Sequence, residues 1–336
     1  MMIDNKSERQ LLNQMIGGYW ISPAIYVAAE LGVADILIEG PRTADQLAEQ
    51  TNVNCNALYR LLRALASVGI FAEDAQHRFL LTPIAEHLRS DAGFFRSLAK
   101  IAGTELYQCW GNLLYSVQTG NEAFHQTFGA LFFDYMMRSP DRHAIYDEAM
   151  AGVHGIETGP MIDSYDFSSL GTVVDIGGGN GLTLAGVLQR HPTIRGILFD
   201  LPAVADRAQH VISDLGLSDR CEIVGGDFFT SVPVGCDAYI MRHIMHDWDD
   251  TEAAAILSNC REAMGSESRV LVVESVIPPG NVPCNGKWLD LMMLIVGGRE
   301  RTEDQYRLLF AQAGLKLNRV IPTTHEVSII EGIRMV

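Results

Sequence analysis

The sequence lacks the features of a membrane or secreted protein. It contains no run of about 18 uncharged apolar residues that could cross a bilayer. Its first residues, Met1-Met2-Ile3-Asp4-Asn5-Lys6, lack the apolar core of a signal peptide. The six cysteines are scattered without a C-x-x-C pair, which is typical of reduced thiols. We therefore expect a cytoplasmic protein that has no membrane partner.

Positive charge is also scarce. Lysine and arginine together number 25, against 41 aspartate and glutamate residues, so the net charge is −16. Such a surface repels nucleic acid and anionic lipid, because binding to either depends on neutralising phosphates. The 336 residues, 48% of them apolar, are enough for two domains, and no repeat or low-complexity segment interrupts them.

Residues 1 to about 100 show the spacing of apolar residues that is typical of helices. This spacing continues to Leu31, and Gly32 then predicts the end of a helix. Thr43, followed three residues later by Gln46, predicts a capping box at the start of the next helix. Two short apolar segments, 69–71 and 78–81, flank a polar turn, as in the wing of a winged helix.

A winged helix can bind DNA, or it can serve as a scaffold and dimer surface. Residues 1–100 contain nine basic and eleven acidic side chains, a net of −2, and the expected recognition helix offers little beyond Arg60 and Arg63. Because phosphate neutralisation dominates DNA affinity, we expect a dimer surface. Large apolar residues continue through a helical connector, 101–160, where they form core or line an aromatic substrate pocket.

After Gly171 the pattern changes to apolar strands that alternate with helices. Strands are predicted at 172–176, 196–199, 220–224, 237–242 and 269–273, with a final antiparallel pair at 315–320 and 326–334. Continuous apolar strands separated by helices predict a parallel sheet covered on both faces. The predicted fold is α/β, with a Rossmann-like domain at 161–336 after the connector and a helical, winged-helix-like domain at 1–100.

A glycine loop follows the first of these strands. The segment Val173-Val-Asp-Ile-Gly-Gly-Gly-Asn-Gly181 predicts a strand that ends in an acid, then a loop, then a helix that begins near Leu182. Glycines let the backbone approach a ligand and leave helix N–H groups directed toward it. A dinucleotide fingerprint would need a glycine at position 182. Gly177, Gly179 and Gly181 instead match the form seen after an acid in S-adenosylmethionine (SAM) methyltransferases.

Acids follow the next predicted strands, where a sheet of this kind binds its ligand. Asp200 lies 19 residues beyond Gly181, close to the spacing at which an acid holds ribose hydroxyls, although it could also start a turn at 201–202. Asp227 is a candidate acceptor for an adenine amino group, and Phe228 could pack on the base.

The segment Met241-Arg-His-Ile-Met-His-Asp-Trp-Asp-Asp250 contains the candidate base. A histidine with a pKa near neutrality at the end of a strand is suited to remove a hydroxyl proton, and both His243 and His246 meet this description. A base of this kind needs a partner on its other ring nitrogen. Glu274, at the end of the next strand, and Glu300 are candidates for that partner.

The chain resembles the caffeic-acid-type family of SAM-dependent O-methyltransferases, which includes plant phenylpropanoid enzymes and bacterial natural-product enzymes. The resemblance covers nearly the whole length, as a helical dimerisation domain followed by a methyltransferase domain. Five motifs in the family's order carry it: Asp175-Ile-Gly-Gly-Gly-Asn-Gly181, Phe199-Asp-Leu-Pro202, Gly225-Gly-Asp-Phe228, His246-Asp-Trp248 with Asp250, and Gly297-Gly-Arg-Glu-Arg-Thr302.

The resemblance implies a role for each matched residue. The histidine of the His-Asp-Trp motif is the family's general base, which selects His246 over His243, and the family's two orienting glutamates fall on Glu274 and Glu300. The cofactor contacts are implied in the same way: the ribose acid falls on Asp200, the adenine contacts on Asp227 and Phe228, and Arg242 stands where members often have a basic residue near the cofactor.

We therefore expect a homodimeric SAM-dependent O-methyltransferase that acts on a hydroxyl, in particular a phenol, of a small aromatic molecule. The loop before the double glycine is shorter than in the plant enzymes, as in bacterial members, and Met150 and Met292 match the family's pocket methionines loosely. No metal is expected, because Asp249 and Glu252 have the spacing of a helix capping pair. Two alternatives stay open: an N- or C-methyltransferase of the same fold, and a SAM-binding or winged-helix regulator without catalysis.

Overall fold

The structure is a computed structural model that describes residues 7–335, and these residues form two compact units. The first unit contains the described residues up to Asn112 together with Phe133–Gly152. The second contains Leu113–Phe132 and the described residues from Val153 onward. The predicted connector, 101–160, is therefore shared between the two units.

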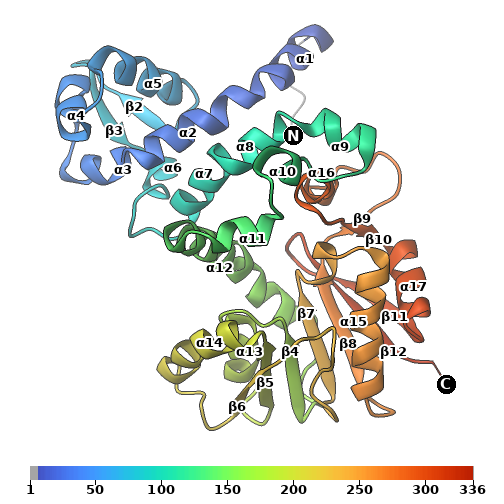
Figure 1. Ribbon diagram of the computed structural model, residues 1–336. Helices are drawn as coiled ribbons and strands as arrows, with labels where there is room; N and C mark the ends of the chain where they lie inside the picture. Colours follow the sequence, from blue (N-terminus) through green and yellow to red (C-terminus); the bar gives the residue numbers. More distant parts are fainter. Residues whose placement is uncertain (1–6, 336) are drawn as a thin grey trace. The chain divides into compact units, whose positions relative to one another are not determined.

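The first unit is mainly helical (Figure 1). A three-stranded antiparallel sheet of order β1-β3-β2 accompanies the helices. Gly32 has a left-handed φ of 66° just after α2, and Thr43 and Gln46 form the predicted capping box. The β2–β3 hairpin lies where the wing was predicted. The elements are α1 (Glu8–Gly17), η1 (Gly18–Trp20), α2 (Ile21–Glu30), α3 (Val33–Ile36), η2 (Leu37–Glu39), β1 (Arg42–Thr43), α4 (Ala44–Thr51), α5 (Cys55–Ser67), β2 (Phe71–Glu73), β3 (Arg78–Leu81), α6 (Pro83–Glu86), α7 (Phe95–Gly103) and α8 (Glu105–Trp110).

A helix that crosses a membrane needs a minimum length and hydrophobicity. Among residues 7–335, no single helix is long and apolar enough to cross a membrane, whereas the pair Glu8–Glu30 and Val33–Glu39, bent by 55°, passes by length and composition alone. Two helices contain the division between the units: α11 (Phe132–Met137) and α12 (Pro140–Ser164).

The second unit contains the predicted parallel sheet. Its seven strands have the order β11-β12-β8-β7-β4-β5-β6, and β8, β7, β4, β5 and β6 are mutually parallel, while β12 and β11 are antiparallel, as predicted. The elements of this unit are α9 (Leu113–Thr119), α10 (Ala123–Phe128), β4 (Thr172–Ile176), α13 (Leu182–Arg190), β5 (Arg195–Asp200), α14 (Pro202–Asp214), β6 (Cys221–Gly225), β7 (Ala238–Arg242), η3 (Met245–Asp247), α15 (Asp250–Ala263), β8 (Arg269–Glu274), β9 (Val276–Ile277), α16 (Gly286–Val296), β10 (Arg301–Thr302), α17 (Glu303–Gln312), β11 (Leu315–Pro322) and β12 (Ser328–Arg334).

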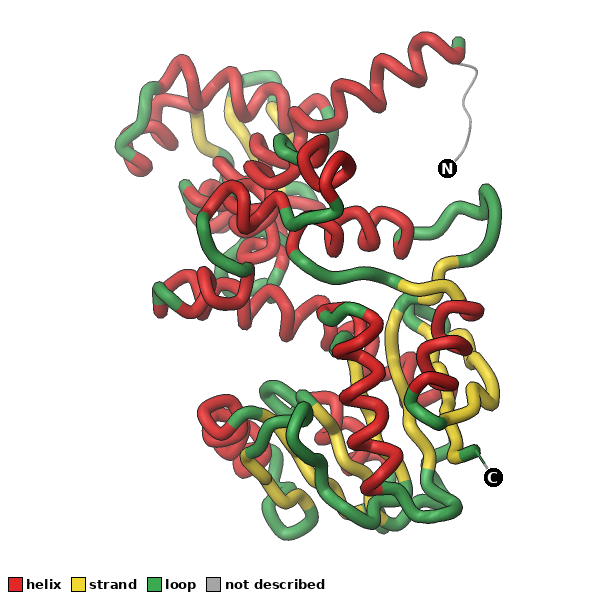
Figure 2. The backbone as a smooth tube through the Cα atoms, turned by 45° about the vertical axis from the view of Figure 1, so that its right-hand side comes forward, coloured by secondary structure: helices red, strands yellow, loops and turns green. Residues whose placement is uncertain are grey.

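Alternate residues of each strand pack on opposite faces of the sheet. On β7, for example, Ala238 and Ile240 belong to the apolar cluster that includes α13 and α14, and Tyr239 and Met241 belong to the cluster that includes α15 and α17. Figure 2 shows helices on both sides of these strands. Burial on both faces explains why the strands are largely apolar, since most side chains enter one core or the other.

A second, two-stranded sheet determines where the last motif lies. Strand β10 pairs in parallel with β9, so that Arg301 is aligned with Val276. Because β9 follows β8 directly, this pairing brings Glu300 next to the end of β8 at Glu274. Two glutamates that are 26 positions apart in the chain are thereby placed at one edge of the main sheet.

Candidate active site

The glycine loop has the predicted form. Gly177, Gly179 and Gly181 have φ values of 68°, 56° and 81°, in the left-handed region that favours glycine. Helix α13 begins at Leu182, with Gly181 as its N-cap. A Cβ on Gly177 would lie 2.5 Å from Cδ1 of Ile244, whereas a Cβ on Gly179 would meet no described atom within 4 Å. The loop is therefore packed on one side and open on the other.

Asp200 anchors this loop from the end of β5. Its Oδ2 accepts a hydrogen bond from the N–H of Gly179 at 2.8 Å, and its Oδ1 accepts one from the N–H of Leu201 at 2.7 Å. Burial raises the pKa of Asp200, and the two N–H donors oppose this rise. The carboxylate thus begins the turn into α14 and also holds the glycine loop, and its contact with the ribose stays a prediction.

Asp227 and Phe228 follow β6 at the same edge of the sheet. Oδ1 of Asp227 accepts from the N–H of Phe229 at 2.8 Å, and the carbonyl of Phe228 accepts from Nδ2 of Asn259 at 2.8 Å. The rings of Phe228 and Trp248 meet edge to face with centroids 6.0 Å apart. The acid is exposed and the ring half-buried, as a shallow adenine site would require.

Asp175 on β4 and Arg242 on β7 lie on adjacent strands, and the charge of each affects the pKa of the other. Nη1 of Arg242 donates to the carbonyl of His154 at 2.8 Å and to Oγ1 of Thr158 at 2.9 Å, both on α12. Asp175 is 2% exposed, and within residues 7–335 its Oδ2 has no hydrogen-bond partner. Burial raises the pKa of Asp175 to about 7, against the charge of Arg242. A buried carboxylate oxygen without a donor needs an explanation, and a bound cation or ammonium group would supply one.

These residues fit SAM. The open side of a left-handed glycine loop leaves room for a ligand against the backbone, the fixed carboxylate of Asp200 suits ribose hydroxyls, and Phe228 offers an aromatic face. The partnerless oxygen of Asp175 lies beside this loop, since a Cβ on Gly178 would be 3.1 Å from it. Among residues 7–335, no group of three histidine, cysteine or acidic side chains is arranged to hold a metal ion.

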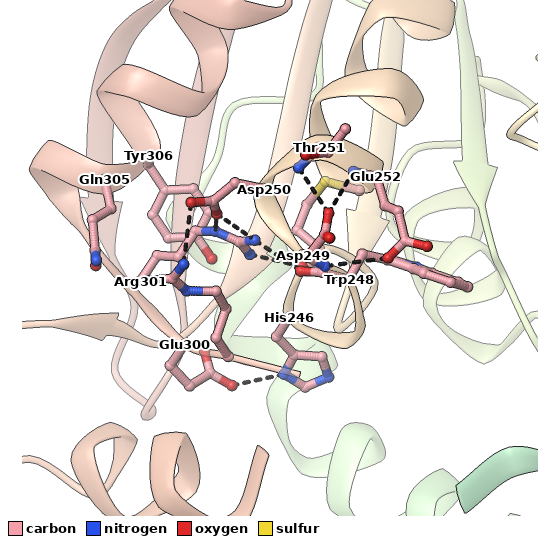
Figure 3. A network of polar contacts seen from close by, with 12 residues as sticks. His246, Trp248, Asp249, Asp250, Thr251, Glu252, Glu300, Arg301, Gln305 and Tyr306 are labelled. Atoms are coloured by element: carbon pink, nitrogen blue, oxygen red, sulfur yellow. Dashed lines mark hydrogen bonds and ion pairs between the residues drawn. The ribbon is translucent and has the colours of Figure 1, made fainter. Parts of the chain in front are cut away.

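The predicted base, His246, makes its shortest side-chain contact with Glu300. Nδ1 of His246 lies 2.7 Å from Oε1 of Glu300, whose side chain is fully buried. Figure 3 shows this carboxylate directed at the imidazole ring. The other ring nitrogen, Nε2, lies 3.6 Å from Oδ1 of Asp247, beyond hydrogen-bond distance. The structure thus brings the base and one predicted orienting glutamate together.

Glu274 also reaches His246, but through the main chain. Its Oε1 accepts from the backbone N–H of His246 at 3.0 Å, and its Oε2 accepts from the hydroxyl of Tyr306. The expectation that Glu274 orients the ring nitrogen is therefore wrong in this detail: it holds the segment that carries the ring. Burial raises the pKa of Glu274 to about 7, while the charge of His246 and the hydrogen bond from Tyr306 oppose this rise.

Three carboxyl groups determine the charge of His246. Burial disfavours the imidazolium, but Asp247, Glu300 and Glu274 outweigh burial and raise the pKa of His246 to about 10. Burial raises the pKa of Asp247 to about 6. In the protein without ligands the ring is therefore protonated near neutrality, and its neutral form, which can act as a base, is a strong one.

Sequence reasoning did not assign the residues that support this base. Arg301, fully buried, donates to the carbonyl oxygens of Met245 and Trp248 at 2.7 and 2.8 Å and to Asp250 at 3.0 Å (Figure 3). Tyr306 has the helical spacing of a core residue. Arg301 could have been noticed as a charged residue within the last motif.

Sequence reasoning named His243 but not the two residues of α12 that contact it, Glu157 and His154. Nε2 of His243 lies 2.7 Å from Oε2 of Glu157 on α12, and the ring of His243 stacks on that of His154 with centroids 4.5 Å apart. His243 has a φ of 52°, which is rare for a residue with a side chain. Burial lowers the pKa of His243 well below its usual value. A buried neutral ring held in this way suits a structural role better than that of the base.

The two candidate pocket methionines lie in different units. Met150 is on α12 in the first unit, and Met292 is on α16 in the second, and both are half-buried. Their role in acceptor binding stays a prediction.

The fold and the site together define the class. A parallel sheet with a glycine loop after its central strand and acids at the following strand ends is the architecture of a SAM-dependent methyltransferase. The sequence model of an O-methyltransferase domain matches residues 110–316, and that of an O-methyltransferase dimerisation domain matches residues 13–91. The chain belongs to this O-methyltransferase family and is a SAM-dependent O-methyltransferase, as the five motifs implied.

Known relatives agree with this assignment. The phenazine O-methyltransferase PhzM of Lysobacter antibioticus is 44% identical over 96% of this chain and 95% of its own length. The crystal structure of LaPhzM matches 98% of this chain and 100% of its own with a TM-score of 0.92 at 42% identity. The O-methyltransferase NcsB1 from neocarzinostatin biosynthesis, solved with SAM and 2-hydroxy-5-methyl naphthoic acid, matches 94% and 96% with a TM-score of 0.83 at 36% identity. Two other relatives, 37% and 29% identical, carry names that specify methylation of nitrogen.

Proposed function

We propose that this enzyme methylates a phenolic hydroxyl of a small aromatic natural product, with His246 as the general base. The observation that carries the proposal is the 2.7 Å contact between Nδ1 of His246 and the buried carboxylate of Glu300. A carboxylate in this position accepts a hydrogen bond from the Nδ1–H group, which leaves Nε2 as the nitrogen that can take a proton from the methyl acceptor. The relatives named for phenazine and naphthoate chemistry support an aromatic acceptor.

Methyl transfer to a phenol needs such a base, because a phenol has a pKa of about 10 and is largely protonated near pH 7. The O–H bond breaks as its proton passes to Nε2 of His246, and the oxygen gains the electron pair that forms its bond to carbon. SAM, when bound, supplies the methyl group and leaves as S-adenosylhomocysteine. The surrounding carboxylates raise the pKa of His246, which makes its neutral ring a stronger base toward a phenol.

The cofactor site is proposed at the carboxyl ends of β4, β5 and β6. Gly177, Gly179 and Gly181 would lie along the methionine part and Asp200 would bind the ribose. The adenine would lie against Asp227 and Phe228, and Arg242 would stay near the site through its contacts with α12. In this arrangement the protein supplies position and deprotonation, which are the two things that methyl transfer to oxygen needs.

The acceptor atom is tested by substituting the base. We expect His246→Ala to lower kcat by about 10²–10⁴-fold, the usual contribution of a general base, while the Kd of SAM stays within a few-fold. Purified enzyme with methyl-labelled SAM and a panel of phenols and aromatic amines should give products with the methyl group on oxygen. Methylation of an amine with little loss in His246→Ala would instead establish the nitrogen alternative, because a neutral amine already carries its reactive electron pair.

We also propose that the enzyme is a homodimer formed through its first unit. Five apolar residues of α1 and η1 are between 58% and 66% exposed, which is costly in water and typical of an interface: Leu12, Met15, Ile16, Tyr19 and Trp20. Ile16→Glu should produce a monomer by light scattering. The control Val234→Glu, at a residue of the second unit that is 81% exposed, should stay dimeric. A dimer that survives Ile16→Glu places the interface elsewhere.

The cytoplasm stays the expected compartment.

A further inference from the structure

Tyr306 is a buried hydroxyl that the chemistry described so far does not use. It lies on α17, is fully buried, and donates to Oε2 of Glu274, a side chain that is also fully buried. The other oxygen of the same carboxylate accepts from the backbone N–H of His246 at 3.0 Å. One carboxylate therefore connects the hydroxyl on α17 to the main chain of the proposed base.

We propose that Tyr306 is a positioning residue for methyl transfer, whose hydroxyl fixes the Glu274 carboxylate and, through it, the main chain that carries the His246 ring. The inference rests on the proposed function of His246. It adds that the orientation and charge of the base depend on a phenol on a different helix, which does not itself touch the base.

The physical need for this hydroxyl follows from burial. A carboxylate removed from water is costly unless its oxygens receive hydrogen bonds. Burial raises the pKa of Glu274, and the hydrogen bond from Tyr306 is one of the interactions that hold it down. Loss of the hydroxyl removes the donor to Oε2, so Glu274 will take up a proton more readily. The carboxylate is also no longer held in its present place beside His246, so its negative charge acts less strongly on the ring.

The charges around His246 determine the direction in which its pKa changes. His246 is faced by Asp247, Glu300 and Glu274, and its ring lies 5.1 Å from that of His243. Glu274 is faced by His246, Glu300, Arg301 and Tyr306. Because Glu274 raises the pKa of His246, a carboxylate that is held less closely raises that pKa less. Tyr306→Phe is therefore expected to make His246 a weaker base while the aromatic ring stays in the core.

Tyr239 provides a matched control. It is also fully buried in the same apolar cluster, and its hydroxyl lies 2.9 Å from the carbonyl oxygens of Pro233 and Ala263. Tyr239→Phe removes the same atom from the same kind of core, but without a link to Glu274. Any loss of stability common to buried tyrosines will therefore occur in both variants.

The experiment is an NMR titration of full-length protein with labelled histidine and no ligand, in which the His246 signal is assigned by its absence in His246→Ala. We expect Tyr306→Phe to lower the pKa of His246 by about half to one unit, and Tyr239→Phe to leave it unchanged. The double variant Tyr306→Phe/Glu274→Gln should show the same pKa of His246 as Glu274→Gln alone, because the residue through which the hydroxyl acts is already neutral. An unchanged His246 titration in Tyr306→Phe, or an equal shift in Tyr239→Phe, would overturn the proposal.

Measurements of turnover distinguish the role of Tyr306 from the proposal that a phenol is the methyl acceptor. With any phenol that the panel shows to be methylated, Tyr306→Phe should move the rising limb of log kcat to lower pH by about half to one unit. On the high-pH plateau, where the ring is neutral in both enzymes, it should lower kcat about two- to threefold, with the KM of SAM changed less than about twofold. A purely structural role predicts parallel losses in Tyr306→Phe and Tyr239→Phe. A shifted titration combined with methylation only of amines would keep the link between Tyr306 and His246 and reject the phenol as acceptor.

Discussion

A Cβ placed on Gly298 would lie 2.1 Å from the carbonyl oxygen of His246. The two residues approach this closely because the N–H of the next residue, Arg299, donates to that same carbonyl at 2.8 Å. Glu300 follows directly and reaches the His246 ring. The second glycine of the last motif is therefore required by the close contact between this segment and the turn that carries the base.

Gly298→Ala should accordingly displace the base. We expect a loss of about 1–3 kcal/mol in the free energy of unfolding from overpacking, and a fall in kcat of about 100-fold, the usual cost of moving a catalytic group by 1 Å. Gly159→Ala, on α12, is the control, since its Cβ meets no described atom within 4 Å. Denaturation curves and kcat check both, and an active Gly298→Ala enzyme would show that the turn adapts.

The pH dependence of turnover reports the charge of His246. The reaction needs the neutral ring, and the surrounding carboxylates raise the pKa of His246 to about 10 in the protein without ligands. Log kcat should therefore rise with pH from neutrality toward 10, with a midpoint below 10 once the positive sulfonium is bound.

Glu300→Gln should move this rising limb to lower pH and reduce its plateau. Glu300 is one of the carboxylates that raise the pKa of His246, and it also fixes the ring. A limb that stays in place in Glu300→Gln would mean that another group is being titrated. The measurement is kcat at saturating SAM between pH 6 and 10.

Asp200 is expected to control cofactor binding. In Asp200→Asn one carboxylate oxygen becomes an NH2 group, so either the Gly179 or the Leu201 N–H loses its acceptor, and the negative charge is lost as well. We expect the Kd of SAM to rise about 10–100-fold by calorimetry, as for loss of charge-assisted hydrogen bonds. Asp214→Asn, an exposed acid on the following helix, should leave the Kd unchanged. Equal effects of the two variants would indicate a general effect of charge.

The strands of the second unit could be predicted because their chemistry is local. Most side chains of β4 and β7 enter one core or the other, so these strands are largely apolar, and the capping boxes at Thr43 and Asp249 need residues only three positions apart. The division at Gly152 could not be predicted. It depends on which segments pack together, and helix α12 runs through it without a break in helical spacing.

The site was predictable where motifs carry it and not where packing does. His246, Glu274 and Glu300 lie in matched segments, and the structure brings them together. Glu274 differs from the expectation because its position at the end of β8 faces the backbone of η3, a relation that no spacing reveals. Tyr306 is 32 positions from its partner and has the helical period of a core residue, so its hydroxyl gave no signal.

Arg301 is expected to be the main support of the catalytic turn. Its guanidinium binds the carbonyls of Met245 and Trp248 on either side of His246, and it lies fully buried. Arg301→Met would leave both carbonyls without this donor, so we expect a loss of about 2–4 kcal/mol in the free energy of unfolding, from two main-chain acceptors left without it.

Arg299→Met separates this support from charge alone. Arg299 contacts the same Asp250 at 3.1 Å, but its side chain is 40% exposed, so its loss should cost under about 1 kcal/mol. The backbone N–H of Arg299 still donates to His246 in that variant. Urea denaturation with kcat on the same samples checks both substitutions. Arg301→Lys should fall between them, because an ammonium group cannot reach all three acceptors with the planar geometry of a guanidinium. If Arg301→Met were as stable and as active as Arg299→Met, the turn would be held by Glu274 and the backbone of Arg299 without the guanidinium.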